Sequence, residues 1–217
     1  MIAIYKGAGA FWEGPMYERI GVQEILNGKL RQLAMFIMPG GRDRAYHADL
    51  RGKPNFLLRR FVEAGGTYLG ICAGAYYGCK RVEFDRGFPL EVCEERELQF
   101  FSGTAVGPAY GKGTFDYESS KGVRMASIGT SEGIFYSHYN GGCTFEGDFS
   151  HIRILGRYLD LPNQPPAIIQ LRVGDGTVIL SGVHIEKHLS HFPENPSADE
   201  VKMEMKDRLA RLGAIIR

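Results

Sequence analysis

One cysteine stands in a glycine-rich turn that could make it a nucleophile. Residues 70–74 read Gly-Ile-Cys-Ala-Gly; an apolar, β-prone stretch precedes them, and residues 75–79, which can begin a helix, follow. A strand, a tight G-x-C-x-G turn and a helix form a nucleophile elbow, which projects the Cys72 thiol at the carboxyl edge of a sheet. The helix N-terminus beneath the thiol favours negative charge and eases thiolate formation. The alternative is a buried cysteine in an ordinary strand-to-helix turn.

A base and a carboxylate follow far downstream. Residues 178–186 read as a strand that ends in His184-Ile185-Glu186. Residues two apart on a strand point to the same face, so the Glu186 carboxylate can hold the His184 imidazole. Cys72, His184 and Glu186 would then form a triad of nucleophile, base and orienting group. Two alternatives stay open: a surface strand with its polar residues outward, and a zinc site in which His184, Glu186 and His188 alternate along one strand.

An acyl-transfer site also needs donors for the oxyanion that develops at the attacked carbonyl. The backbone N–H of Ala73, just after the cysteine, is one candidate, and Gly40 or Gly41 is the other because glycine allows close backbone approach. The glycines also fit an ordinary turn with no catalytic role. Arg42, Asp43 and Tyr46 follow this loop and could face the pocket.

The first third of the chain predicts the elements that must position these residues. Strands are expected at 2–5, 34–38 and 67–71, and helices at 15–27 and 54–64, the second with Phe56, Leu57, Phe61 and Val62 inward. Alternating strands and helices with short links are typical of a doubly wound α/β fold. Such folds place their sites at the carboxyl ends of strands, where Cys72 and the 38–43 loop both fall.

The pattern turns β-rich after residue 81. Short strands are expected at 99–106, 123–128, 133–139 and 152–159, with Asn140-Gly141 as a hairpin turn. Residues 167–173 and 177–183 flank Asp175-Gly176 and predict the clearest hairpin in the chain. A last helix is expected at about 197–212. The three prolines of residues 161–166 predict a local loop rather than a linker, so we expect a single domain over residues 1–217.

Composition excludes several classes of protein. The 217 residues carry a net charge of +1, which gives no electrostatic case for nucleic acid or a membrane surface. No apolar run is long enough for a transmembrane helix, and residues 1–6 do not read as a signal peptide. The four cysteines form no CxxC pair and no disulfide framework, so a reducing cytoplasm is expected, with neither a metal nor a cofactor.

Four stretches resemble a known family. They are residues 38–43 (Met-Pro-Gly-Gly-Arg-Asp), residues 61–77 with the elbow, residues 139–142 (Tyr-Asn-Gly-Gly) and residues 182–184. Across most of residues 1–190 the chain resembles the class I glutamine amidotransferase superfamily, and within it the N-terminal domain of eukaryotic-type biotin-protein ligases. The resemblance implies a flavodoxin-like α/β fold, with a mainly parallel central sheet, helices on both faces and an added β-rich segment near 98–160.

The chain departs from the amidotransferase pattern at the site itself. Tyr76 occupies the position where glutamine-dependent members carry Gln, and Ile185 replaces the Pro of the usual H-P-E. There is no G-R-G-R-type biotin-binding loop, so biotinylation by this chain alone is not expected. The sequence favours a cysteine-dependent amide hydrolase or transferase that forms a thioester. A non-catalytic regulatory or docking module with a protein partner is the alternative.

The substrate is expected to be a small amide or a peptide-like molecule. Tyr76, Tyr77, Tyr139 and Asn140 fall in the two stretches nearest to the ligase branch, and with Arg42 they would form an aromatic rim. Free glutamine would instead require charged groups for its ammonium and carboxylate, and only Arg42, Asp43 and Glu13 stand near. The alternative is that the tyrosines simply pack in the core.

Overall fold

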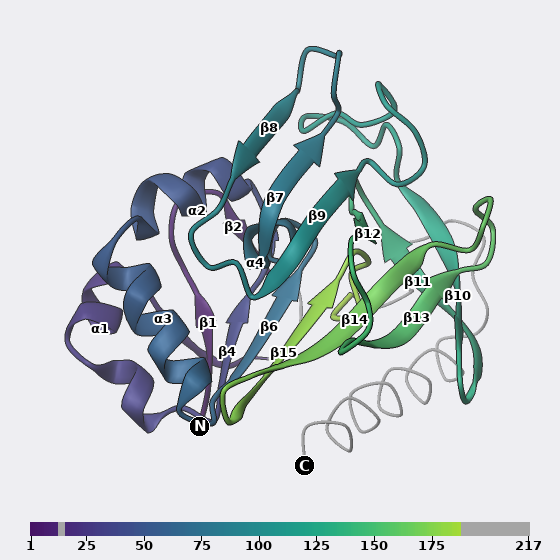
Figure 1. Cartoon of the computed structure of the whole chain (residues 1–217). Coiled ribbons are helices and arrows are strands. Elements are labelled where there is room, and N and C mark those ends of the chain that lie inside the picture. The colour runs from purple at the N-terminus through teal and green to yellow at the C-terminus, as the bar shows by residue number, and fades with distance from the viewer. Residues whose placement is uncertain (13–15, 188–217) are drawn as a thin grey trace.

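The computed structural model describes residues 1–12 and 16–187. Its helices and strands are labelled in Figure 1. The helical elements are α1 (Val22–Leu26), the 3-10 helix η1 (Lys29–Gln32), α2 (Asp43–Leu50), α3 (Lys53–Glu63) and α4 (Ala73–Gly78). The strands are β1 (Ile2–Tyr5), β2 (Ala10–Phe11), β3 (Glu18–Ile20), β4 (Met35–Met38), β5 (Gly40–Gly41), β6 (Thr67–Ile71), β7 (Cys79–Phe84), β8 (Val92–Glu95), β9 (Phe101–Gly107), β10 (Arg124–Thr130), β11 (Gly133–Tyr139), β12 (Thr144–Glu146), β13 (Arg153–Tyr158), β14 (Pro166–Val173) and β15 (Gly176–Ser181).

A nine-stranded sheet forms the centre of the fold. Its order is β11-β10-β13-β14-β15-β6-β4-β1-β3, and the five strands from β15 to β3 run parallel. Every residue of β4 and β6 is buried, as expected for parallel strands covered on both faces. The α/β fold with a parallel centre is thereby confirmed. The carboxyl ends of β4, β6 and β15 lie next to one another, which brings distant parts of the sequence to one edge.

Two apolar cores lie against this sheet. Phe36 and Tyr68 point to the first core, where helices α1 to α4 contribute their buried side chains. Ile37 and Leu69 alternate with them and belong to the second core, on the opposite face. The helix predicted at 54–64 is present as α3, but Phe56 is 62% exposed, so its inward placement was wrong. Leu58 and Val62, one turn apart, fill the buried stripe instead.

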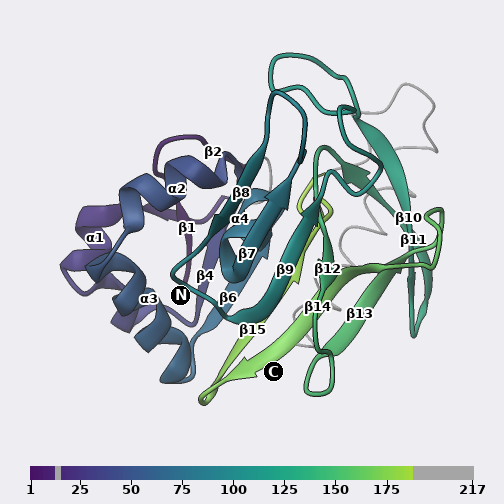
Figure 2. The same ribbon diagram turned by 45° about the horizontal axis from the view of Figure 1, so that its top comes forward.

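The β-rich part of the chain forms two structures. β10, β11 and β13 extend the nine-stranded sheet in antiparallel fashion, and β7, β8, β9 and β12 build a separate four-stranded sheet. Figures 1 and 2 show this second sheet beside the first, with α4 between them. Residues 159–165 connect the paired strands β13 and β14, and the predicted hairpin of β14 and β15 is confirmed.

Two elements differ from the sequence prediction. The helix expected at 15–27 is wrong in its first half, because residues 18–20 form β3 and pair with the sheet edge at β1, which buries Ile20. The helix begins only after Gly21. Asn140-Gly141 does not close a hairpin either, since β11 pairs with β10 and the next strand, β12, joins the other sheet.

The helix expected at 197–212 lies outside the described residues. In residues 1–12 and 16–187, no helix combines the length and the apolar character that crossing a lipid bilayer requires.

Candidate functional site

Cys72 occupies a strained turn between β6 and α4. Its backbone angles are φ 49° and ψ −106°, a region that non-glycine residues enter at a cost of about 1–3 kcal/mol. Glycines on either side make the turn possible: a Cβ at Gly70 would lie 2.4 Å from the Gly74 carbonyl oxygen, and one at Gly74 only 2.0 Å from that of Met38. The Cys72 N–H donates to the Ser181 carbonyl of β15 at 2.8 Å. The predicted elbow geometry is therefore present.

His184 and Glu186 are paired, although not for the reason predicted. β15 ends at Ser181, and residues 182–187 form a bend rather than the continuing strand that the sequence indicated. The bend is anchored where the His184 N–H donates to the His138 carbonyl of β11 at 2.8 Å. Within it, His184 Nδ1 lies 2.7 Å from Glu186 Oε1, and both side chains are buried. The contact between His184 and Glu186 is therefore formed within a turn, and not by the alternation of side chains along a strand as predicted.

The environment of His184 favours its protonated form. Burial by itself would lower the pKa of the imidazole, but the Glu186 carboxylate and the Cys72 sulfur together raise it to about 10. The histidine is therefore set to hold a positive charge beside the thiol. Such a charge is the usual means of lowering the free energy of a thiolate.

The Gly40-Gly41 segment passes directly beside the imidazole. It forms β5, pairs with β2, and is fixed by the Tyr46 hydroxyl, which donates to the Gly40 carbonyl at 2.6 Å. A Cβ at Gly40 would lie 2.6 Å from His184 Cε1, so only glycine lets the ring pack there. Gly41 has φ 140° and also lines the pocket. The Ala73 N–H, at the first position of α4, has no carbonyl of a preceding helical turn to bond.

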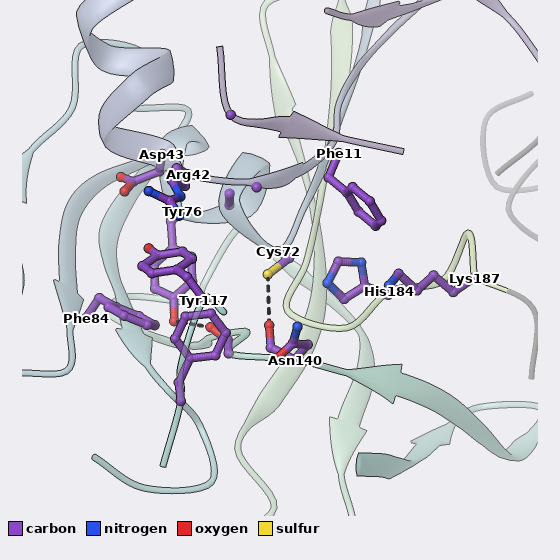
Figure 3. A pocket seen from close by; sticks show the side chains of 15 residues that line it. Phe11, Arg42, Asp43, Cys72, Tyr76, Phe84, Tyr117, Asn140, His184 and Lys187 are labelled. Carbon is purple, nitrogen blue, oxygen red and sulfur yellow. Dashed lines mark hydrogen bonds between the residues drawn. The ribbon is translucent and has the colours of Figure 1, made fainter. Parts of the chain in front are cut away.

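These elements enclose a cavity of about 370 Å³. Figure 3 shows Cys72 near its centre, with the sulfur 3.5 Å from the Asn140 carbonyl oxygen. The residues that line it come from loops, strand ends and the helices α2 and α4, and are Gly9, Phe11, Gly41, Arg42, Asp43, Cys72, Ala73, Tyr76, Phe84, Phe115, Tyr117, Asn140, Gly141, His184 and Lys187.

Most of the residues singled out in the sequence meet at this cavity. Its wall includes Cys72, His184, Gly41, Ala73, Arg42, Tyr76 and Asn140. Glu186 and Gly40 do not line the cavity, but both adjoin the His184 ring. Tyr77 and Tyr139 do not reach the cavity: the Tyr77 hydroxyl donates to Asn55 Oδ1, and the Tyr139 hydroxyl to the Gly142 carbonyl. Both are core tyrosines, so the expectation that they line the pocket is wrong for them.

Several lining residues were missed. Five of them, Phe11, Phe84, Phe115, Tyr117 and Lys187, were not singled out, because no motif marks them and all five lie in loops or at strand ends. Asp43, which the sequence suggested could face the pocket, does line it and is held by the buried Arg96, whose Nε and Nη2 lie 2.8 and 2.7 Å from its Oδ2. Burial raises the pKa of Asp43, and the Arg96 guanidinium opposes that rise. Glu13, the other acidic candidate, lies outside the described residues.

The zinc alternative gains no support from the geometry. His184 Nδ1 is engaged by Glu186, and His188 lies outside the described residues. Within residues 1–12 and 16–187, no group of three or more His, Cys, Asp or Glu side chains is arranged to hold a metal ion.

The fold matches solved structures, among them one of a glutamine amidotransferase. A crystal structure of glutamine amidotransferase aligns with 92% of this chain and 86% of its own, at a TM-score of 0.61 and 19% identity. A chain in the structure of PurLQS from Thermotoga maritima aligns with 96% of this chain and 98% of its own, at a TM-score of 0.60 and 13% identity. At such identities the likeness establishes the fold alone.

Sequence relatives give a narrower assignment. An uncharacterized protein from Chlamydia muridarum is 44% identical over 76% of this chain and 64% of its own length. A biotin-protein ligase from Schizosaccharomyces pombe is 36% identical over 85% of this chain but only 30% of its own length. The chain thus spans less than two thirds of either relative. Residues 26–214 match the family described as biotin-protein ligase, N terminal. The chain belongs to the biotin-protein ligase N-terminal family, with an amidotransferase-like fold.

Proposed function

We propose that this protein is a cysteine-dependent amide hydrolase or acyltransferase that uses Cys72, His184 and Glu186. The observation that carries the proposal is one arrangement: a thiol held in a strained elbow at a cavity, beside an imidazole whose far nitrogen is bound by a buried carboxylate. A merely structural turn requires neither the strain nor the buried His–Glu pair.

In the first step the Cys72 thiolate attacks the carbonyl carbon of an amide. The new C–S bond pushes the carbonyl electron pair onto oxygen, and in this proposal the N–H groups of Ala73 and Gly41 stabilise that oxyanion. Imidazolium His184 then gives its proton to the amide nitrogen. The C–N bond breaks, the amine leaves, and a thioester remains on Cys72.

In the second step a water molecule, or an acceptor amine, attacks the thioester. Neutral His184 takes the proton of the attacking group, and Glu186 stabilises the imidazolium that forms. The C–S bond breaks, and the thiolate and imidazolium are restored. With water as the attacking group, the products are one carboxylic acid and one amine.

The proposal does not include hydrolysis of free glutamine. Tyr76 stands where glutamine-dependent members carry Gln, and its hydroxyl donates to the Gly141 carbonyl at 3.1 Å. Two of the charged side chains that line the cavity are paired within the protein, Asp43 with Arg96 and Arg42 with Glu118. A free amino acid would find few groups to hold both its ammonium and its carboxylate. Because the chemistry needs a reduced thiol, we place the protein in the cytoplasm.

Limited alkylation tests the nucleophile. At neutral pH and with a small amount of iodoacetamide, Cys72 should be modified before the other three cysteines, as mapped by mass spectrometry. Burial raises the pKa of the Cys79, Cys143 and Cys93 thiols. At neutral pH these three cysteines therefore hold little of the thiolate form that reacts with iodoacetamide. Faster labelling of any of these three would contradict an activated Cys72.

Turnover tests the reaction itself. Amides of small carboxylic acids should release amine with the wild type, and Cys72→Ala should lower the rate by at least about a thousandfold. Cys143→Ala is the matched control because that thiol is also buried but does not line the cavity. If no amide is hydrolysed and Cys72 is labelled slowly, the results would favour a non-catalytic module with a protein partner.

A further inference from the structure

Tyr46 carries a buried hydroxyl group to which the mechanism above gives no role. The side chain comes from α2 and is fully buried. Its ring packs edge to face against Tyr5 and Tyr77, with ring centroids 5.5 and 6.1 Å apart. This packing fixes the hydroxyl beside β5, where its oxygen lies 2.6 Å from the Gly40 carbonyl oxygen. Tyr46 therefore bonds to the backbone of the segment that borders His184.

The hydroxyl has one proton to donate, and the Gly40 carbonyl is its acceptor. The Pro39 carbonyl oxygen is also within reach, at 3.2 Å, but it accepts a hydrogen bond from the Gly74 N–H at 3.1 Å. The bond to Gly40 is the shorter one and lies within the normal range for two oxygens. Tyr46 thus holds the peptide group between Gly40 and Gly41.

A fixed Gly40 carbonyl also fixes the direction of the Gly41 N–H. The peptide bond between them is trans, so the C=O of Gly40 and the N–H of Gly41 point in opposite directions. The carbonyl points to the buried Tyr46, and Gly41 lines the cavity. The next N–H along the chain, that of Arg42, donates to the Gly9 carbonyl at 3.1 Å. The Gly41 N–H is therefore the donor that this segment can direct at a ligand.

This peptide group needs an anchor because glycine stands on both sides of it. A peptide group between two glycines rotates at little steric cost, and Gly41 already has φ 140°. The strand pairing of β5 with β2 covers only two residues. If the group rotated by half a turn, a carbonyl oxygen would take the place of the N–H. That oxygen would repel the negative charge that develops on an attacked carbonyl.

The other oxyanion donor, the Ala73 N–H, is tied to the same loop. Ala73 precedes Gly74, whose N–H bonds to the Pro39 carbonyl. A Cβ at Gly74 would lie 2.0 Å from the Met38 carbonyl oxygen, so the start of α4 lies against the end of β4. The two N–H groups therefore belong to segments that are held at a fixed separation.

We propose, on the basis of the proposed function above, that Tyr46 is a positioning residue for the oxyanion. Its hydroxyl holds the Gly40-Gly41 peptide group so that the Gly41 N–H faces the oxygen atom of the attacked carbonyl. Tyr46 does not line the cavity and acts only through the Gly40 carbonyl.

Tyr46→Phe tests this role because it keeps the ring and removes only the hydroxyl. With propionamide as the substrate and ammonia release as the readout, kcat should fall at least about tenfold, since one oxyanion donor is misdirected. KM should change by less than about twofold, because the bound amide carries no oxyanion. Alkylation of Cys72 by iodoacetamide should also stay within about twofold, since that reaction forms no oxyanion. Equal falls in kcat and in the alkylation rate would overturn the role, because they would place the damage in the triad.

Tyr5→Phe is the matched control. Its hydroxyl also belongs to a buried ring and donates to Asp49 Oδ2 at 3.0 Å, and its ring packs against Tyr46. Tyr5 does not line the cavity and has no contact with β5 among the hydrogen bonds of its hydroxyl. Its kcat should stay within about twofold of the wild type. A fall as large as that of Tyr46→Phe would assign the effect to general loosening of the core.

An aldehyde tests the same donor without cleavage of an amide. The Cys72 sulfur bonds to the carbonyl carbon of propionaldehyde, and the electron pair of the C=O bond moves to oxygen, as in the amide reaction. Protection of Cys72 against iodoacetamide measures the affinity for the aldehyde. Tyr46→Phe should weaken that affinity about tenfold. Equal protection in the two proteins, or none in the wild type, would overturn the proposal.

Glycine labelling tests the donor in the wild type, so the answer does not depend on the folding of Tyr46→Phe. With ¹³C in the carbonyl and ¹⁵N in the amide of glycine, only the second residue of each Gly-Gly pair gives a correlated NMR signal. The sequence has such pairs at 40–41, 65–66 and 141–142. Gly40→Ala removes the Gly41 signal and so identifies it. Propionaldehyde should move the Gly41 signal and leave that of Gly66 in place; an unmoved Gly41 signal in the Cys72 adduct would overturn the proposal.

The outcomes keep this role separate from the hydrolase. If the wild type cleaves no propionamide but Tyr46→Phe binds the aldehyde more weakly, the role of Tyr46 stands and the hydrolase proposal fails. If both proteins cleave propionamide at equal rates and are protected equally, the hydrolase stands and the role of Tyr46 fails.

Discussion

At the scale of single residues, Glu186 should control the protonation of His184 and, through it, the reactivity of Cys72. Glu186→Gln removes the charge that raises the pKa of the imidazole, so the proton beside the thiol is lost at a lower pH. The rate of Cys72 alkylation between pH 6 and 7 should fall by about tenfold, as measured by stopped assays at each pH. Turnover should fall by about a hundredfold or more, because the imidazole also loses its orienting partner.

Glu146→Gln is the control, since Glu146 is exposed and does not line the cavity. An unchanged alkylation profile in Glu186→Gln would mean that the buried pair does not govern the thiol.

The same pair should make folding stability depend on pH. The pKa of His184 is raised in the folded state, so its imidazolium stabilises the fold fully below about pH 6.5 and progressively less as the pH rises towards 10. Urea denaturation of the wild type should show a loss on the order of 2 kcal/mol over this range. Glu186→Gln should show a smaller loss; an equal one would assign the effect to other groups.

At the scale of elements, β5 acts as a spacer for the imidazole. Gly40→Ala introduces a methyl group 2.6 Å from His184 Cε1, and its backbone lies outside the positive-φ region. The ring must shift, and a displacement approaching 1 Å costs about a hundredfold in turnover. Thermal melts should change little. Gly21→Ala is the control, because its nearest neighbours are the ends of flexible Lys6 and Glu24 side chains. Unchanged turnover in Gly40→Ala would contradict this role.

The start of α2 depends on a buried ion pair. Arg96→Met would leave the Asp43 carboxylate, next to the 40–42 loop, without its partner and should cost about 3–5 kcal/mol of unfolding free energy. In urea melts, the double variant Asp43→Asn/Arg96→Met should recover part of that loss. As a control, Arg60→Met at an exposed position should change the unfolding free energy of the wild type by less than about 0.5 kcal/mol. No recovery in the double variant would show that Arg96 acts through packing alone.

The elements that were predicted well have strong local signals. The apolar runs of β4 and β6, the Gly65-Gly66 end of α3 and the Asp175-Gly176 hairpin all follow from short-range chemistry. The failures have long-range causes. Residues 18–20 form a strand because they pair with the edge of the sheet at β1. The bend after Ser181 is held by a backbone bridge between His184 and His138, which lies in β11. Neither partner is visible in the local sequence.

At the scale of the whole molecule, the candidate site is assembled from segments that meet only in the folded sheet. The thiol comes from the end of β6, the imidazole from the bend after β15, and the loop glycines from β5. Motifs could identify these groups because each needs a particular residue type. The aromatic residues that line the cavity could not be identified, since Phe84, Phe115 and Tyr117 need only be flat and apolar, and two of them lie in an irregular loop.

This arrangement has a consequence in time. Cys72 and His184 are 112 residues apart in sequence, yet β6 and β15 are direct neighbours in the sheet. During synthesis the thiol therefore leaves the ribosome on the order of ten seconds before its base. Until β15 is inserted, Cys72 should be an ordinary cysteine. Ribosome-bound chains stalled before His184 should be alkylated at Cys72 more slowly at pH 6.5 than the released protein, so that reactivity appears only when the sheet is complete.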